Sequence, residues 1–282
     1  MEIAVFGLGL IGGSVAKAIK KYTPHTVLGA DTSEQVMYKA RLLDAIDGEI
    51  TAERLGICDV VILATWPQTA VRLLEEHADS LKKGALVMDV CGVKRAVCEP
   101  LWQLAKEKGF TFVGGHPMAG VEYAGFDHAT AALFQGASMI LTPPAGTDIA
   151  TLERLKQFWM QLGFGRVVLT TPEKHDAMIA YTSQLAHVVS SAYAQSPTAQ
   201  EHFGFSAGSY KDMTRVARLN EQMWTELFLC NQELLLLELD GLIERLSAMR
   251  DALAKGDETA LQALLRRGRE CKEQADRKDY DA

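Results

Sequence analysis

The chain has 282 residues, of which 48% are hydrophobic and 23% charged, as in an ordinary globular protein. This length predicts two domains, each large enough to bury a core. The net charge of -7 argues against nucleic acid as a partner, and it means that an anionic substrate needs a local basic site.

The cysteine pattern favours a reducing compartment. The five cysteines form no Cys-x-x-Cys pair and show no metal-ligand spacing with histidine, so we expect free thiols, no bound metal and a cytoplasmic location. The N-terminus has Glu2 and a glycine cluster where a secretion signal needs a basic start and an apolar core. No apolar stretch reaches about 18 residues, so no membrane span is expected.

The first elements of the chain predict a strand, a glycine turn and a helix. An apolar run at 2–6 precedes Gly7, Gly9 and Gly12, which match the Gly-x-Gly-x-x-Gly dinucleotide fingerprint. The first glycine makes the tight turn, the second lets a pyrophosphate approach the backbone, and the third lets the helix pack closely on the strand. The phosphates would lie at the helix N-terminus, where free N–H groups favour negative charge.

Asp31 favours nucleotide binding over the alternative, a glycine-rich turn that binds nothing. A second apolar run at 26–30 ends at this aspartate, roughly 20 residues beyond the glycines, where an acidic side chain binds a ribose 2′-hydroxyl. Thr32 and Ser33 follow, and no arginine stands beside Asp31 to accept a 2′-phosphate. We therefore expect NAD rather than NADP as the cofactor.

Strands and helices alternate up to residue 171. After a helix capped by Ser33, further strands are expected at 59–64, 85–90, 111–113, 138–142 and 166–169, with helices at about 94–108 and 148–162. The alternation predicts an α/β, Rossmann-type, doubly wound parallel sheet, in a nucleotide-binding domain at 1–171.

From residue 172 only helical periods follow, which predicts an all-α domain at 172–282. Its first helix begins at Pro172 and runs to about residue 196, and a loop is expected at 203–209. The stretch 224–249 carries leucine on nearly every face, which predicts a helix buried all round. A small domain can hardly cover such a helix alone, so we expect a homodimer that packs through these C-terminal helices.

Ligands of doubly wound sheets bind beyond the carboxyl ends of the strands. Three segments are expected there: Thr65 with its two neighbours, the turn at 89–94, and His116. Glycines and Pro117 hold His116 on a rigid turn, and the usual histidine pKa of about 6.5 suits proton transfer. The alternative for His116 is a structural bond to the loop backbone.

A compact basic face is the second candidate. If the segment is helical, Lys211, Arg215 and Arg218 lie on one face, and arginine can hold a carboxylate with two parallel hydrogen bonds. The alternative is a solvated face paired with acids. His187 is expected either to face the cleft or to be a core histidine. The other histidines, His175 among them, are expected at the surface or in packing.

Four segments together resemble the prephenate/arogenate dehydrogenases of tyrosine biosynthesis. They are the glycine turn at 7–14, the turn at 89–94, the His-Pro-Met-Ala-Gly sequence within 114–120, and Lys-Asp-x-Thr-Arg within 210–215, which Trp224 follows. The last two motifs are far more specific than the glycine fingerprint. The likeness spans nearly the whole chain, in order.

The resemblance implies an NAD-dependent enzyme that converts prephenate to 4-hydroxyphenylpyruvate, or arogenate to tyrosine, by oxidative decarboxylation. It implies that His116 accepts the proton of the ring 4-hydroxyl and that Arg215 pairs with a substrate carboxylate. Lys211 would support that anion site, and His187 would line the pocket. The cofactor site that it implies comprises Gly7, Gly9, Leu10, Ile11, Gly12, Asp31 and Thr65.

The chain departs from the family pattern at three positions that affect substrate contacts. Gly92 stands where many members have a serine that bonds the substrate hydroxyl, and Gln184 and Ala186 replace a histidine and a proline. The choice between prephenate and arogenate stays open.

Two other classes are weighed against this function. A β-hydroxyacid dehydrogenase or imine reductase would share the glycine turn and a helical second domain, but its catalytic lysine should lie on the first C-terminal helix, where only Lys174 occurs, at the very start. A non-enzymatic NAD-binding sensor would need neither His116 nor the basic face.

Overall fold

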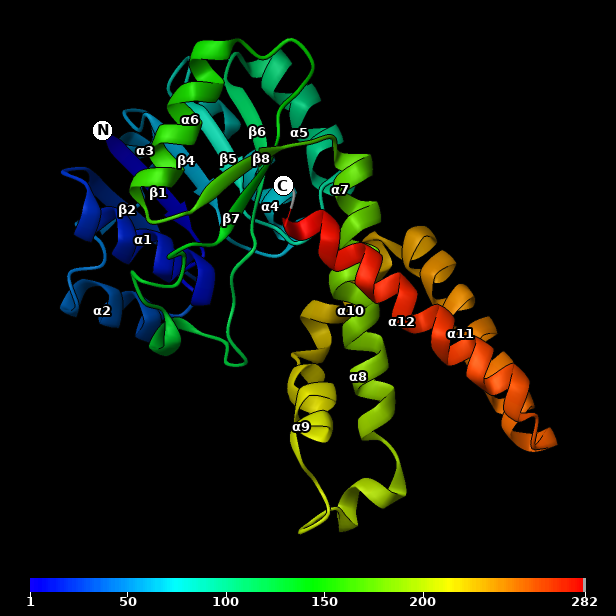
Figure 1. The fold of residues 1–282 in the computed structure, drawn as a ribbon. Coiled ribbons are helices and arrows are strands. Elements are labelled where there is room, and N and C mark those ends of the chain that lie inside the picture. The colour runs from blue at the N-terminus through cyan, green and yellow to red at the C-terminus, as the bar shows by residue number, and fades with distance from the viewer. Residues whose placement is uncertain (281–282) are drawn as a thin grey trace. The chain divides into compact units, whose positions relative to one another are not determined.

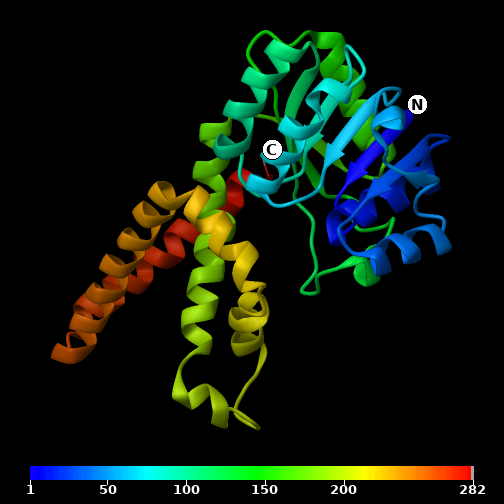
Figure 2. The same ribbon diagram turned by 180° about the vertical axis from the view of Figure 1, so that it is seen from behind.

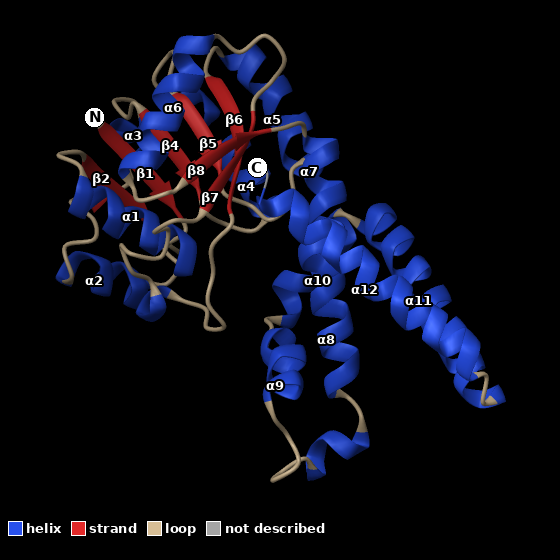
Figure 3. Ribbon diagram, viewed as in Figure 1, coloured by secondary structure: helices blue, strands red, loops and turns tan. Residues whose placement is uncertain are grey.

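The N-terminal part of the chain folds around one eight-stranded sheet in the computed structural model (Figures 1 and 3). The structure describes residues 1–280. In spatial order the strands are β3 (Gly48–Glu49), β2 (Thr26–Ala30), β1 (Glu2–Phe6), β4 (Val60–Leu63), β5 (Leu86–Asp89), β6 (Thr111–Pro117), β7 (Ser138–Thr142) and β8 (Arg166–Leu169). The order reverses between β1 and β4, which creates a switch point at their carboxyl ends, where such sheets bind ligands.

Helices cover both faces of the sheet, and each face has its own apolar core (Figures 1 and 2). One face packs against α1 (Leu10–Tyr22), α2 (Glu34–Leu42) and α6 (Ile149–Gln161). The other packs against α3 (Ala52–Leu55), α4 (Pro67–His77) and α5 (Arg95–Lys108). The predicted Rossmann-type sheet followed by a helical domain is confirmed.

The direction of β7 differs from the parallel arrangement that the sequence indicated. β7 pairs antiparallel with β6, and β8 pairs parallel with β7. The strands from β1 to β6 pair with one another in parallel, so β7 and β8 run opposite to the rest of the sheet. A parallel pair needs a long crossover, usually an α-helix. Residues 118–137, between β6 and β7, contain the short 3₁₀ turn η2 (Phe126–His128) and no α-helix, so the chain turns back along the sheet.

Side-chain caps set several helix boundaries. The hydroxyl of Ser33 accepts the N–H of Val36 at 3.3 Å, which confirms the predicted cap of α2. Asp148 caps α6 in the same way through the N–H of Thr151. Gly109, with φ of +81°, ends α5 in the left-handed region that glycine adopts without strain.

We expect Ser33→Ala to lower the free energy of unfolding by about 1 kcal/mol, because the variant leaves a helix N–H without its cap. Denaturant unfolding of the two proteins measures the difference. Thr32→Ala removes the neighbouring exposed hydroxyl and serves as the control. Equal losses in both variants would contradict the capping role.

The C-terminal part of the described chain is helical, as predicted. The helical run that starts at Pro172 contains a π-helical turn, where the hydrogen-bond register shifts. The elements are α7 (Pro172–Ile179), the π turn η3 (Ala180–Leu185), α8 (Ala186–Ala194), η4 (Pro197–Glu201), α9 (Gly208–Thr214), η5 (Arg215–Ala217), α10 (Glu221–Cys230), α11 (Gln232–Lys255) and α12 (Glu258–Tyr280).

The prediction of one continuous helix over 224–249 is wrong. The segment is divided at Asn231 into α10 and α11, because the Asn231 amide turns inward and bonds the backbone oxygen of Asp176. Leu229 and Leu237 are 64% and 69% exposed on the single chain, so the predicted burial on all faces would need a second subunit and stays a prediction. The leucines therefore form apolar surface on the single chain.

The chain packs as two compact units, residues 1–232 and the residues from Glu233 onward. The predicted domain boundary between residues 171 and 172 stays a prediction.

No helix within residues 1–280 is long and apolar enough to cross a membrane. The cytoplasmic location also stays a prediction.

Candidate functional site

The loop between β1 and α1 forms an open cradle. Gly7 has φ of +84°, and a side chain on it would meet Ala64 and Thr65. A side chain on Gly12 would overlap the carbonyl oxygen of Gly7, so this glycine permits the close approach of helix and loop. Gly9 has no neighbouring atom within 4 Å of the position of a Cβ, so the space above it is open. The cradle fits a pyrophosphate that approaches the backbone.

The N-terminus of α1 faces this cradle. The helix begins at Leu10 and Ile11, the two other predicted contacts in the loop, and Gly9 gives it no side-chain cap. The first N–H groups of an uncapped helix can therefore bind an anion, and the helix dipole favours negative charge there.

Asp31 and Thr65 lie at the same edge of the sheet. Asp31 directly follows β2, and its carboxylate accepts the N–H of Leu8 at 2.8 Å and the N–H of Ser33 at 2.9 Å. Thr65 follows β4, and its methyl carbon lies 2.9 Å from the position of a Cβ on Gly7. The structure thus brings the carboxylate and the threonine together around the glycine loop.

A buried ion pair lies at the carboxyl end of β5. Asp89 and Lys94 are both fully buried, and the Lys94 ammonium bonds the Asp89 carboxylate and donates to the carbonyl oxygen of Gly115 at 2.6 Å. Burial acts to lower the pKa of Lys94, but the Asp89 carboxylate and the Cys91 and Cys98 thiols together raise it by more, so the pKa of Lys94 is raised. The pair fixes the 89–94 turn to β6, one residue before His116.

His116, near the carboxyl end of β6, is the first of three linked side chains. Its Nδ1 lies 2.9 Å from Nε2 of His175, and Nδ1 of His175 lies 2.7 Å from Oδ1 of Asp176. His175 and Asp176 are buried on α7, whereas His116 is partly exposed. The Asp176 carboxylate also accepts the N–H groups of Lys94 and Arg95, at 2.7 and 2.9 Å, where α5 begins.

The surroundings keep both imidazoles neutral. Burial lowers the pKa of His116 well below its usual value, and the Lys94 ammonium and the neighbouring His175 ring act in the same direction. Burial also lowers the pKa of His175, although its hydrogen bond to Asp176 opposes this effect. A neutral imidazole has one nitrogen that can accept a proton, so His116 is suited to act as a base.

Gly92 leaves space next to Nε2 of His116, the ring nitrogen that does not face His175. The position of a Cβ on Gly92 lies 4.0 Å from Nε2 of His116 and 3.4 Å from Cδ2 of Leu227. Any contact of residue 92 with a ligand in this space is made by its backbone.

His187 and Trp224 form a stacked pair. Their ring centroids are 3.7 Å apart with an angle of 28° between the planes, and Nδ1 of His187 lies 2.9 Å from the carbonyl oxygen of Ser183. Burial lowers the pKa of His187, and the nearby Arg215 guanidinium lowers it as well. His187 is partly exposed, so it is not a fully buried core histidine.

Arg215 pairs with an acid from the loop that follows His116. Its Nη1 lies 3.5 Å from Oε1 of Glu122, and the Arg215 side chain is 61% exposed. Lys211 lies on α9, four residues before Arg215. Arg218 does not share this face, because α9 ends at Thr214 and the backbone of Arg218 is extended. The predicted three-residue basic face is therefore wrong for Arg218.

Gln184 has a structural role in this fold. It is buried in the π turn, donates to the carbonyl oxygen of Leu227 at 3.0 Å and accepts the amide of Asn231 at 2.8 Å. These bonds hold α10 against the π turn. At position 184, where the chain departs from the family pattern, the side chain therefore joins the π turn to α10.

Comparison with known proteins decides the family. The model of the prephenate dehydrogenase nucleotide-binding domain matches residues 15–169, and the model of the prephenate dehydrogenase dimerization domain matches residues 171–267. The chain belongs to the prephenate dehydrogenase family.

Individual members of the prephenate dehydrogenase family match nearly the whole chain. A cyclohexadienyl dehydrogenase of Zymomonas mobilis is 34% identical over 265 residues, covering 91% of this chain and 89% of that protein. A prephenate dehydrogenase of Bacillus subtilis is 33% identical over 90% of this chain and 71% of its own length. The structure of Aquifex aeolicus prephenate dehydrogenase in complex with hydroxyphenyl propionate and NAD+ superposes with a TM-score of 0.81, at 28% identity and 98% coverage of both chains.

Three residues that lie next to His116 or Arg215 in this chain were not predicted from the sequence as part of the site. His175 was expected at the surface or in packing, but it is buried against His116. Asp176 and Glu122 were not predicted either. For Asp176 the sequence offers a signal, because it directly follows His175 near the start of a helix. Glu122 carries no such signal, because its partner Arg215 is distant in the sequence.

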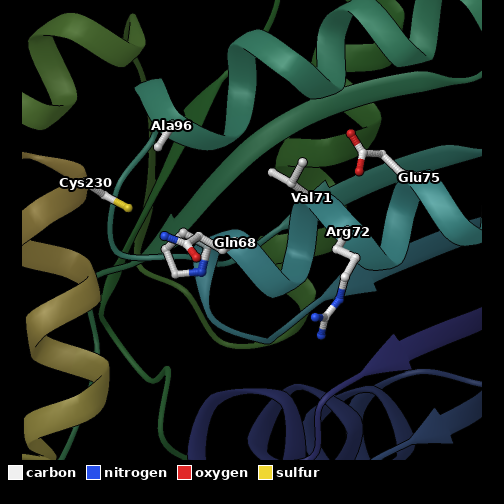
Figure 4. Close-up of a pocket in the computed structure, with 7 residues that line it drawn as sticks. Gln68, Val71, Arg72, Glu75, Ala96 and Cys230 are labelled. Atoms are coloured by element: carbon white, nitrogen blue, oxygen red, sulfur yellow. The ribbon is translucent and has the colours of Figure 1, made fainter.

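Two surface hollows lie outside this group of residues. One, of about 240 Å³, is lined mostly by α4, with Ala96 of α5 and Cys230 of α10 (Figure 4). The other, of about 300 Å³, lies between α8 and α10, and Trp224 is part of its wall. Neither hollow contains His116. Within residues 1–280, no group of three His, Cys, Asp or Glu side chains could hold a metal ion.

Proposed function

We propose that this chain catalyses the NAD-dependent oxidative decarboxylation of prephenate to 4-hydroxyphenylpyruvate. The observation that supports this most is the partly exposed His116, whose pKa is lowered by burial, on the same edge of the sheet as the glycine cradle. Membership of the family over both of its domains agrees with it. The relatives named prephenate and cyclohexadienyl dehydrogenase agree with it as well.

His116 acts on the ring hydroxyl of the substrate in this proposal. Nε2 of His116 accepts the hydroxyl proton while the hydrogen on the same carbon departs as hydride, so that a ketone forms. NAD, when bound in the glycine cradle, supplies the hydride acceptor. The ketone then receives the electron pair of the breaking bond to the ring carboxylate, which leaves as CO2. The phenolate that forms regains a proton from the His116 imidazolium and becomes a phenol, and its aromaticity drives the second step.

The cations near α9 hold the substrate carboxylates. Arg215, the residue that directly follows α9, pairs with one of them, and Lys211 on α9 adds a second positive charge. His187, stacked on Trp224 and close to Arg215, lines the pocket on this side. In a chain with a net charge of -7, such a local basic site is what a dianionic substrate requires.

The direct test is the appearance of NADH absorbance with purified protein. Prephenate and arogenate are each offered with NAD and with NADP. Turnover of prephenate with NAD supports the proposal, and the ratio of kcat/KM between the two substrates assigns the preference. Faster turnover of arogenate would assign the alternative substrate. If neither is turned over, the proposal fails, and β-hydroxy acids are the next substrates to test.

Asp31→Ala is expected to weaken NAD binding by about 10- to 100-fold and to narrow the preference over NADP, because a charged hydrogen bond to the ribose is lost. Titration of the nucleotide, followed by protein fluorescence, measures both affinities. Thermal unfolding of the free variant shows whether the loop survives, since Asp31 also bonds the N–H groups of Leu8 and Ser33. A wild-type protein that binds NADP more tightly than NAD would contradict this role.

The functional form in this proposal is a homodimer assembled through the C-terminal helices. The family model over 171–267 describes a dimerization domain, and large apolar side chains of α11 are exposed on the single chain, among them Leu237, Ile243 and Leu246. Burial of such side chains between subunits stabilises an obligate dimer. Sedimentation equilibrium of the intact chain tests this, and a monomer at micromolar concentration would refute it.

A further inference from the structure

The contacts of Asp176 determine where the protons of the neighbouring imidazole lie. Its carboxylate oxygens face the backbone N–H groups of Lys94 and Arg95, Nδ1 of His175 and, at 3.7 Å, Nε of the Arg95 guanidinium. A carboxylate in such a position only accepts, so the nitrogen that faces it has to donate. His175 therefore carries its proton on Nδ1.

The same reasoning extends to His116. A neutral imidazole holds one N–H, so Nε2 of His175 has a lone pair and accepts. The atom 2.9 Å from it is Nδ1 of His116, which has to be the donor. The remaining nitrogen of His116, Nε2, is then unprotonated, and it lies on the side where Gly92 has no side chain.

We propose that His175 and Asp176 are positioning residues that hold His116 in the Nδ1–H tautomer, with Nε2 directed at the substrate. That the proton comes from a substrate hydroxyl rests on the proposed function, whereas the tautomer of His116 does not. When Nε2 takes the hydroxyl proton, the new N–H bond replaces the O–H bond and His116 becomes an imidazolium. Its Nδ1–H stays bonded to His175, and no bond to His175 forms or breaks.

The surroundings favour this orientation of the two rings. His175 and Asp176 are buried, and Asn231 bonds the backbone oxygen of Asp176 at 2.9 Å. The other charged groups that act on His175 are Lys94 and Asp89 of the 89–94 turn, which pair with each other. The imidazolium that forms on His116 is therefore joined through His175 to the Asp176 carboxylate.

The tautomers can be observed in the wild-type protein without any substrate. Protein labelled with ¹⁵N-histidine is studied by long-range proton–nitrogen correlation above the pKa of both rings, and His116→Asn and His175→Gln assign the signals. Both rings are expected to carry the proton on Nδ1. A proton on Nε2 of His116 would overturn the proposal, whatever reaction the enzyme catalyses.

A pair of variants tests the effect on catalysis. His175→Leu removes the acceptor for Nδ1–H of His116, and we expect kcat for prephenate to fall by about 10- to 100-fold with KM nearly unchanged. His175→Gln places an amide oxygen near the former Nε2 and should recover most of kcat. His128→Leu, at an exposed histidine, is the matched control.

The outcomes of these assays separate positioning from a structural role. A kcat equal to that of the wild type in His175→Leu overturns the proposal. An equal loss of kcat in the leucine and glutamine variants also overturns it, because both variants lose the buried ring but only glutamine keeps an acceptor for Nδ1–H. Nucleotide binding shows that the variants are folded. If the leucine variant does not fold, the tautomer measurement decides. Absence of turnover in the wild type would count against the proposed function, not against the tautomer.

Discussion

His116→Asn is expected to lower kcat for prephenate by about 10²- to 10⁴-fold while NAD affinity stays within about twofold, because proton transfer to a positioned base contributes this much to a rate. Asparagine is the sharpest replacement, since its amide N–H can stand near the former Nδ1 and still donate to His175. The buried His175 and Asp176 then keep their partners. His128→Asn is the matched control, and an unchanged kcat in His116→Asn would remove His116 from the reaction.

The pH dependence of the wild type provides a second measure of the same role. Below the pKa of His116 the ring is protonated on Nε2 and cannot accept the substrate proton, so kcat/KM is expected to rise with pH and then level off. Burial lowers this pKa below its usual value, so the rise should be centred below about pH 6.5. His116→Asn should lose this acid limb. An acid limb that persists unchanged in the variant would assign it to another group.

Seven of the eight strands were predictable because each is a short, largely apolar run, whereas β3 (Gly48–Glu49) has no such run and was not predicted. The runs at 26–30, 138–142 and 166–169 coincide with β2, β7 and β8 to the residue. Such runs are typical of strands in a parallel sheet, so hydrophobicity alone locates them, even at β8, which is mostly exposed at the edge of the sheet. It gives no direction, and the reversal of β7 depends on the connection from β6, which contains no α-helix within 118–137.

The site was predictable where a motif fixes the backbone and unpredictable where it depends on a long-range contact. The positions of Gly7 and Asp31 at one edge of the sheet could be predicted because they follow from the turn and from the spacing, and their roles stay predictions. His175 meets His116 across 59 residues of sequence, and no local pattern reports that contact. Asn231 interrupts a leucine-rich run without changing its apolar period, so the break between α10 and α11 was equally hidden.

Arg215→Ala is expected to raise KM for prephenate with a much smaller effect on kcat, by an amount equivalent to about 2–5 kcal/mol of binding energy if the carboxylate pair is desolvated. The Arg215 side chain is 61% exposed in the free protein and has one weak partner, Glu122, at 3.5 Å. The pair with Glu122 is then worth at most about 1 kcal/mol, so the guanidinium is readily available to a substrate carboxylate.

Comparison of Arg215→Lys with Arg215→Ala separates the contribution of the positive charge to KM from that of the guanidinium geometry. Arg215→Lys keeps the positive charge but not the two parallel N–H donors, so its KM should lie between those of the wild type and Arg215→Ala. Arg154→Ala, at a helical arginine on α6 whose side chain bonds Thr151, controls for the loss of one positive charge. An unchanged KM in Arg215→Ala would exclude Arg215 from the substrate site. Equal KM values for the lysine variant and the wild type would show that charge alone suffices, and that bidentate pairing plays no part.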